Sequence, residues 1–108
     1  LQALQGHEKT DPLTAPGHAD LTAHVDFEKL ALAAAPATHT RITPQGVFLE
    51  RLGITQRAQT LAKGMTDDAL NSHIAAHKRL THPSEMGNLF KVMGIYPPHQ
   101  NPPPGLEP

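Results

Sequence analysis

Hydrophobic residues along the chain fall into short stretches that proline and glycine separate. Residues 1–18 show no apolar period between these breakers, which predicts an irregular opening segment. After Asp26 comes a run rich in alanine and leucine that stops before Pro36. An aspartate cap followed by such a run predicts a helix over 26–35.

Beyond this helix, the pattern predicts two strands separated by a long helical block. Residues 38–43 (THTRIT) alternate and contain β-branched side chains, and residues 89–96 (LFKVMGIY) are apolar enough for a strand inside a sheet. Between them, residues 44–87 show helical spacing of apolar residues, interrupted by glycines. The tail, 97–108, is half proline and is expected to be extended.

The helical block is predicted to begin with Thr43 as the cap and Pro44 at the first helical position. Residues 19–96 then form the ordered part of an α/β unit. Two strands make no stable sheet in isolation, so this unit needs neighbouring strands that the sequence does not contain.

Composition excludes several classes of protein. The 108 residues include no cysteine, so disulfides and cysteine metal sites are absent. The net charge of −1 argues against a nucleic-acid partner, and no apolar run reaches the ~20 residues of a membrane span. Eleven prolines and a start at Leu1 without methionine lead us to expect a piece of a longer protein.

The stretch around Asp20 and His24 carries the strongest candidate chemistry. Two carboxylates, a hydroxyl and an imidazole fall within seven residues before the predicted helix. Asp20 and His24 are suited to proton transfer or to holding a polar substrate. The alternative is structural: Asp26 caps the helix, Asp20 forms a turn and His24 faces solvent.

Gln45 is a second candidate, because it lies at a predicted helix start with free backbone N–H groups. An ordinary capped helix explains the same residues. His73 and His77 lie four positions apart on a predicted helix, with His82 beyond, and this spacing can hold a metal. The intervening HIAAH lacks the glutamate of the zinc-protease pattern, so a polar helix face explains the pair equally well.

No phosphate-binding glycine loop and no nucleophile elbow is present in the sequence. By itself the pattern supports no catalytic reaction.

Four stretches nevertheless resemble the C-terminal part of the MidA-like family of S-adenosylmethionine-dependent methyltransferases. They are LQALQGHEKTDPLTAPGHADLTAHVDFEKLA (1–31), TPQGVFLERLGITQRAQTLA (43–62), RLTHPSEMGNLFKVMGI (79–95) and PPPGL (102–106). ADLTAHVDF and EMGNLFKVMGI are the most specific parts. The family usually places an aromatic residue where Leu106 stands, and the stretch 71–78 has no clear counterpart there.

The resemblance implies a fold: the C-terminal fragment of a class I, Rossmann-like methyltransferase. Residues 38–43 (parallel) and 89–96 (antiparallel) would be the last two strands of its sheet, and the helical block would be an insertion between them. S-adenosylmethionine would be bound mainly by the missing N-terminal part, so no cofactor-binding residue is assigned and this fragment alone would be inactive.

The resemblance also implies a function: methyl transfer to arginine of a protein substrate, with Asp20 and His24 catalytic and Gln45 substrate-binding. The family includes the mitochondrial enzyme that assists assembly of respiratory complex I, so a complex I subunit is the implied partner. The compartment would be the mitochondrial matrix, or the cytoplasm of a bacterium. The alternative is a stand-alone helical interaction module whose proline-rich tail binds an aromatic groove of a partner.

Overall fold

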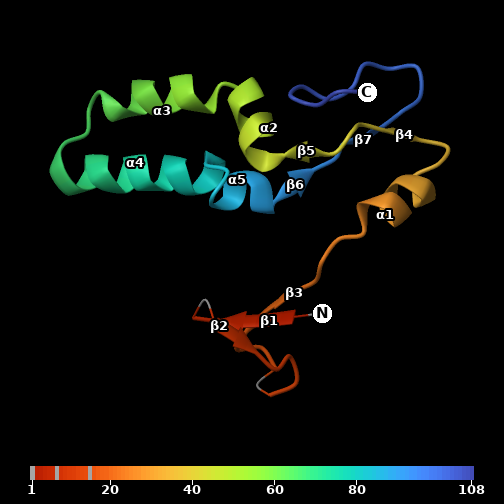
Figure 1. Ribbon diagram of the computed structural model, residues 1–108, viewed down its shortest axis with the longest axis horizontal. Helices are drawn as coiled ribbons and strands as arrows, with labels where there is room; N and C mark the ends of the chain where they lie inside the picture. The colour runs from red at the N-terminus through yellow and green to blue at the C-terminus, as the bar shows by residue number, and fades with distance from the viewer. Residues whose placement is uncertain (1, 7, 15) are drawn as a thin grey trace.

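The computed structural model describes residues 2–6, 8–14 and 16–108. These residues form a mixed α/β arrangement of small antiparallel sheets and five helices. In Figure 1 a small sheet at the N-terminal end lies apart from a longer body that contains the helices and the C-terminal tail. A single connection, running from β3 to α1, joins the two parts.

The N-terminal sheet has three strands in the order β2-β1-β3, all antiparallel: β1 (Gln2–Gln5), β2 (Glu8–Thr10) and β3 (Asp20–Thr22). The sequence predicts an irregular segment over 1–18, and the structure differs by placing two strands there. β2 is polar, and β1 is defined by its pairing with β2 on one side and β3 on the other, so hydrophobic periodicity gives no sign of this sheet. Leu1, His7 and Ala15, within the same predicted segment, lie outside the described residues.

Helix α1 (Phe27–Ala33) begins where the sequence predicts. The Asp26 carboxylate accepts a hydrogen bond from the backbone N–H of Lys29 at 3.1 Å, which satisfies one of the free donors of the first turn. The helix ends at Ala33, two residues short of the predicted 35, with Ala34 as its C-cap.

Two short ladders follow, in which the segment 38–44 runs antiparallel to the segment 91–96. β4 (Thr38–His39) pairs with β7 (Ile95–Tyr96), and β5 (Thr43–Pro44) pairs with β6 (Lys91–Val92). The register shifts by one residue between the ladders, because Arg41 and Ile42 together stand opposite Met93. This arrangement is a β-bulge, which bends the strand pair and divides each predicted strand in two.

The predicted helical block contains four helices. They are α2 (Gln45–Arg51), α3 (Ile54–Ala62), α4 (Asp67–Thr81) and α5 (Met86–Leu89). α3 and α4 form a long antiparallel hairpin, and α2 and α5 lie where the hairpin meets the ladders (Figure 1). Gly53 separates α2 from α3 with a φ of 89°, a left-handed conformation that glycine adopts without a steric cost.

Two boundaries of the block differ from the sequence prediction. Pro44 rather than Thr43 is the N-cap of α2, because Thr43 is 5% exposed and pairs with Val92 in the ladder. The strand predicted over 89–96 begins only at Lys91, since Met86–Leu89 form the turn of α5. Leu89 and Phe90 favour a strand by propensity, but Leu89 is the last residue of α5 and Phe90 is its C-cap, and α5 meets the end of α4 at Gly87.

The proline-rich tail folds back onto the body rather than extending away from it. The backbone N–H of Arg41 donates to the Glu107 carbonyl at 2.9 Å, and the Arg51 guanidinium donates to the Gly105 carbonyl at 3.3 Å. The same guanidinium forms an ion pair with the Glu107 carboxylate at 3.1 Å. Residues 102–106 therefore lie against α2 and the strands.

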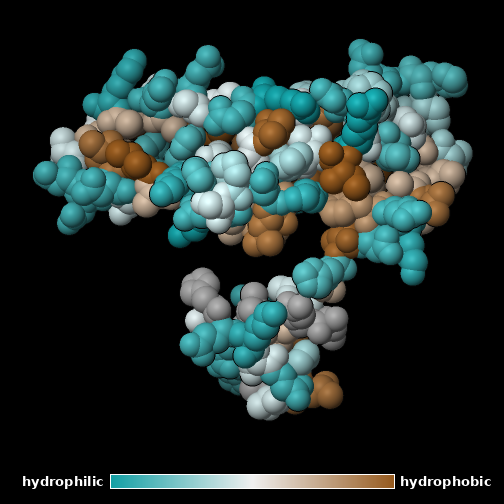
Figure 2. Space-filling view, in the orientation of Figure 1, coloured by the Kyte–Doolittle hydropathy of each residue, from teal (hydrophilic) through white to brown (hydrophobic). Residues whose placement is uncertain are grey.

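The structure has little closed core. Its radius of gyration is 17.6 Å, against about 13 Å for a compact chain of this length. The accessible surface is 8161 Å², while a compact protein of this mass exposes about 5,800 Å². Among the described residues Ala3 is the fully buried hydrophobic side chain, and Figure 2 shows hydrophobic patches on the surface of the helical body.

Candidate functional site

Asp20 and His24 lie on the connection between the N-terminal sheet and the helical body. Asp20 opens the edge strand β3, where it stands opposite Leu4 of the central strand. His24 follows β3 by two residues, and both side chains are exposed. The carboxylate and the imidazole thus both lie at the surface of this connection.

Gln45 lies elsewhere, at the first residue of α2. Its side-chain N–H₂ donates to the carbonyl of Leu80 at 2.9 Å, in the last turn of α4, and its backbone N–H donates to the Phe90 carbonyl at 2.9 Å. Gln45 therefore ties α2 to α4 and to the strand pair. In Figure 1 a wide separation divides β3 from α2, so the structure does not bring Gln45 to Asp20 and His24.

His73 and His77 face neighbouring helices. The Nε2 atom of His73 lies 2.8 Å from the carbonyl oxygen of Ala58, and Nε2 of His77 lies 3.2 Å from Thr55 Oγ1. The Glu50 carboxylate is 3.9 Å from the same His77 nitrogen and accepts a hydrogen bond from Thr55. The pair thus connects α4 to α2 and α3, and a metal would have to displace these contacts.

His82 belongs to a local turn instead. Its Nδ1 lies 2.6 Å from Ser84 Oγ and 3.1 Å from the Ser84 backbone nitrogen. Within the part of the chain that the structure describes, no group of three or more His, Asp or Glu side chains is placed to hold a metal ion.

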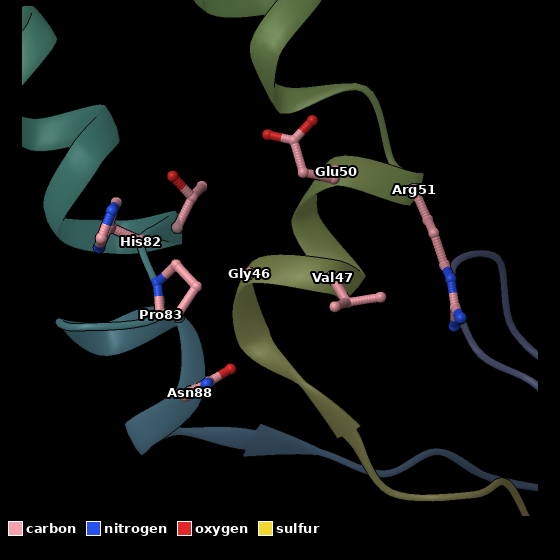
Figure 3. Close-up of a pocket in the computed structure, with 9 residues that line it drawn as sticks. Gly46, Val47, Glu50, Arg51, His82, Pro83 and Asn88 are labelled. Carbon is pink, nitrogen blue, oxygen red and sulfur yellow. The ribbon is translucent and has the colours of Figure 1, made fainter.

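A groove of about 560 Å³ opens where α2, the end of α4 and α5 meet (Figure 3). Gly46 and Gly87 both lie against the backbone of Thr81, so closely that a Cβ on either glycine would overlap its carbonyl oxygen. We call these three residues the glycine junction. Pro83 and Asn88 form the other wall of the groove, and Arg51 points away from it toward the tail.

Sequence reasoning did not assign a role to the glycine junction. The available signal was a glycine inside each of the stretches QGVFLERLGI and EMGNLFKVMGI, where helix formers would otherwise be favoured. Gly46 is buried in the first turn of α2 and Gly87 in α5. A missing side chain at both positions is what lets three backbone segments meet.

The described residues do not form a cradle for S-adenosylmethionine. None of the described glycines belongs to a glycine-rich loop between a strand and a helix. No residue of this chain is therefore assigned to the cofactor, and no reaction step is derived through it. None of the helices in the described ranges has the length and apolar character to cross a bilayer.

Comparison with known proteins identifies the class. Residues 1–45 match the family model described as "Putative S-adenosyl-L-methionine-dependent methyltransferase". This region includes β1, β2, β3 and α1, and thus both Asp20 and His24.

Curated relatives extend the similarity to most of the chain. It is 34% identical over 103 residues to the Drosophila melanogaster "Protein arginine methyltransferase NDUFAF7 homolog, mitochondrial", covering 90% of this chain and 23% of the relative. The rat protein arginine methyltransferase NDUFAF7 is 34% identical over 102 residues, covering 93% and 23%, and the human one 32% over 96 residues, covering 87% and 22%. Both comparisons support membership of the MidA-like family of S-adenosylmethionine-dependent methyltransferases. It spans less than a quarter of the length of these relatives.

Proposed function

We propose that this chain is the C-terminal part of a methyltransferase that transfers a methyl group from S-adenosylmethionine to arginine side chains of a protein. The observation that carries the proposal is the similarity to protein arginine methyltransferases over about nine tenths of the chain. The longer polypeptide supplies the cofactor site, and the chain alone is inactive. Its last two strands join a Rossmann-like sheet.

The large exposed surface of the chain supports the proposal that the chain is one part of a longer polypeptide. A compact protein of this mass would expose about 5,800 Å², and the chain exposes 8161 Å². Large hydrophobic side chains such as Leu32 and Ile42 are 74% and 49% exposed beside the strand pair. Such a surface is typical of part of a domain whose remainder is absent.

Asp20 and His24 are the proposed catalytic residues. A carboxylate accepts hydrogen bonds from a guanidinium in a fixed geometry, and an imidazole accepts the proton that the nitrogen loses on methylation. Their exposure on the connection between the sheet and α1 leaves both side chains accessible to a protein substrate. Holding the arginine nitrogen in line with the methyl group is the main requirement of the reaction.

Gln45 is proposed as a substrate ligand through its side-chain oxygen, because its nitrogen is already bonded to Leu80. The substrate itself is proposed to be a subunit of respiratory complex I, as the family resemblance implies. The compartment is the mitochondrial matrix in a eukaryote or the cytoplasm in a bacterium.

The experiment that tests the function uses a chimera in which this chain replaces the matched 103 residues of the Drosophila relative. We expect it to bind S-adenosylmethionine and to methylate arginine in mitochondrial protein. Asp20→Asn and His24→Gln should each lower kcat by roughly 10²–10⁴-fold. The matched controls Asp68→Asn and His18→Gln should leave it unchanged.

A folded chimera that binds no S-adenosylmethionine would contradict the proposed function. An active chimera whose kcat survives Asp20→Asn and His24→Gln would remove only their catalytic role. If the isolated chain methylated arginine, the site for S-adenosylmethionine would have to lie in this chain and not in the rest of the polypeptide.

The alternative, a stand-alone module with a proline-rich ligand tail, has less support. The tail is held by Arg41, Arg51 and the contact of Gly105 with Phe48. A tail bound to its own helix is poorly placed to enter a partner's groove.

A further inference from the structure

A second groove, of about 460 Å³, lies between α1 and the strand pair. Five of its lining residues are hydrophobic: Phe27, Ala31, Leu32, Ile42 and Met93. Its surface is almost wholly apolar, unlike that of the groove at the glycine junction. We call it the α1 groove.

The α1 groove lies on the bulge of the strand pair. Arg41 and Ile42 occupy the bulged positions opposite Met93, so Ile42 and Met93 come from the two facing strands. The backbone N–H groups of Thr40 and Gly94 are bonded within the strand pair, and that of Arg41 is bonded to the tail. The floor is therefore fixed by hydrogen bonds, while Leu32 of α1 stays 74% exposed. A preformed apolar hollow on a rigid floor fits packing against a hydrophobic element.

Two quantities indicate what covers the α1 groove in the complete protein. The whole chain exposes about 2,300 Å² more surface than a compact protein of its mass, and the exposed side chains of Leu32 and Ile42 at the α1 groove are part of this surface. The relatives are more than four times longer than the stretch that they share with this chain. A large covering partner is thus present in the same polypeptide of each relative.

We infer that the α1 groove is the docking surface for the remaining part of the methyltransferase polypeptide, which inserts hydrophobic side chains between α1 and the strand pair. The inference rests on the proposed function for the identity of this partner. It adds the surface and the residues through which the two parts meet.

The three methionines provide a test with internal controls. Met93 lines the α1 groove, whereas Met65 follows α3 at the far end of the helical hairpin and Met86 opens α5. The methyl groups are ¹³C-labelled in the isolated chain and in the chimera described above. The Met93 signal is assigned by its loss in Met93→Leu, and a soluble gadolinium chelate measures solvent access.

We expect the relaxation enhancement of the Met93 methyl to fall by roughly threefold or more in the chimera, because a docked partner excludes the chelate. The Met65 methyl should keep its value. Equal enhancement of Met93 in the two proteins would overturn the inference, as would a chimera that shows no cooperative unfolding.

A second measurement uses a charge in the groove. Leu32→Asp should lower the Tm of the chimera but leave the isolated chain unchanged, since Leu32 is exposed there. Leu89→Asp, at a side chain that is 73% exposed outside the groove, is the matched control. Equal effects of the two substitutions would count against docking at this groove.

A second copy of the chain is the competing occupant. Dimerisation of the isolated chain in sedimentation equilibrium, abolished by Leu32→Asp, would overturn the inference in favour of self-association. Protection of Met93 in a chimera that binds no S-adenosylmethionine would instead retain the docking surface and reject the proposed function.

Discussion

Thr40 and Gly94 hold each other through two hydrogen bonds across the strand pair. The backbone N–H of Thr40 donates to the Gly94 carbonyl at 2.9 Å, and the backbone N–H of Gly94 donates to Thr40 Oγ1 at 2.9 Å. The Thr40 hydroxyl in turn donates to the Arg41 carbonyl at 2.9 Å, and the residue is 1% exposed. This buried hydroxyl stabilises the strand pair at the point where the bulge interrupts the regular ladder.

Thr40→Val should therefore lower the free energy of unfolding by about 1–3 kcal/mol, because it leaves a buried N–H without an acceptor. Urea denaturation followed by circular dichroism measures the loss. Thr40→Ser keeps the hydroxyl and should cost less than half as much. Equal losses for valine and serine would show that the methyl group contributes as much as the hydroxyl, and an unchanged Thr40→Val would contradict the role of the hydroxyl.

Gly46→Ala and Gly87→Ala should each destabilise the chain, since a Cβ at either position overlaps the Thr81 carbonyl. Overpacking of this kind costs about 1–3 kcal/mol and rises where the backbone cannot move. Gly64→Ala, in open space after α3, should change stability by no more than about 0.5 kcal/mol. Thermal melts of the three variants test the junction, and a neutral Gly87→Ala would contradict the packing.

The tail should depend more on Gly105 than on the ion pair of Arg51. Arg51 and Glu107 are 37% and 56% exposed at their side chains, and an exposed pair contributes at most about 1 kcal/mol. Gly105 has a φ of 83°, and a Cβ there would lie 3.0 Å from the Phe48 ring. Limited proteolysis should cleave the tail of Gly105→Ala faster than that of Glu107→Gln. The reverse order would mean that the ion pair fixes the tail.

His73→Ala should loosen the α3–α4 hairpin by about 1 kcal/mol, because it removes the contact with the Ala58 carbonyl. Lys78→Ala, at an exposed position of the same helix, is the control. Zinc sulfate added to the native chain should produce no saturable heat in calorimetry, since the Nε2 atoms of His73 and His77 already contact protein groups. Stoichiometric zinc binding lost in His73→Ala would contradict this assignment.

Local chemistry was sufficient for the features that depend on a few neighbouring residues. The carboxylate of Asp26 caps α1, and Gly53 separates α2 from α3, as the glycine interruptions of the helical block predict. The family resemblance was also readable from the sequence, because a motif such as ADLTAHVDF is recognised by the order of its residues alone, and it lies inside the range that matches the family model. The roles of Asp20, His24 and Gln45 stay predictions.

Contacts between segments that are far apart in the sequence decided the remaining features of the fold. The strands β1 and β2 exist through pairing with each other and of β1 with β3. The bulge at Arg41 and Ile42 exists through register with Met93, and the start of β6 is set by Gly87 against Thr81. Each of these depends on which backbone lies opposite, and neither hydrophobic period nor propensity encodes that information. The sequence by itself therefore determined the start of α1, the helical character of residues 44–87 and the family resemblance. The tertiary structure decided the sheets, the bounds of α5, the two grooves and the separation of Gln45 from Asp20 and His24.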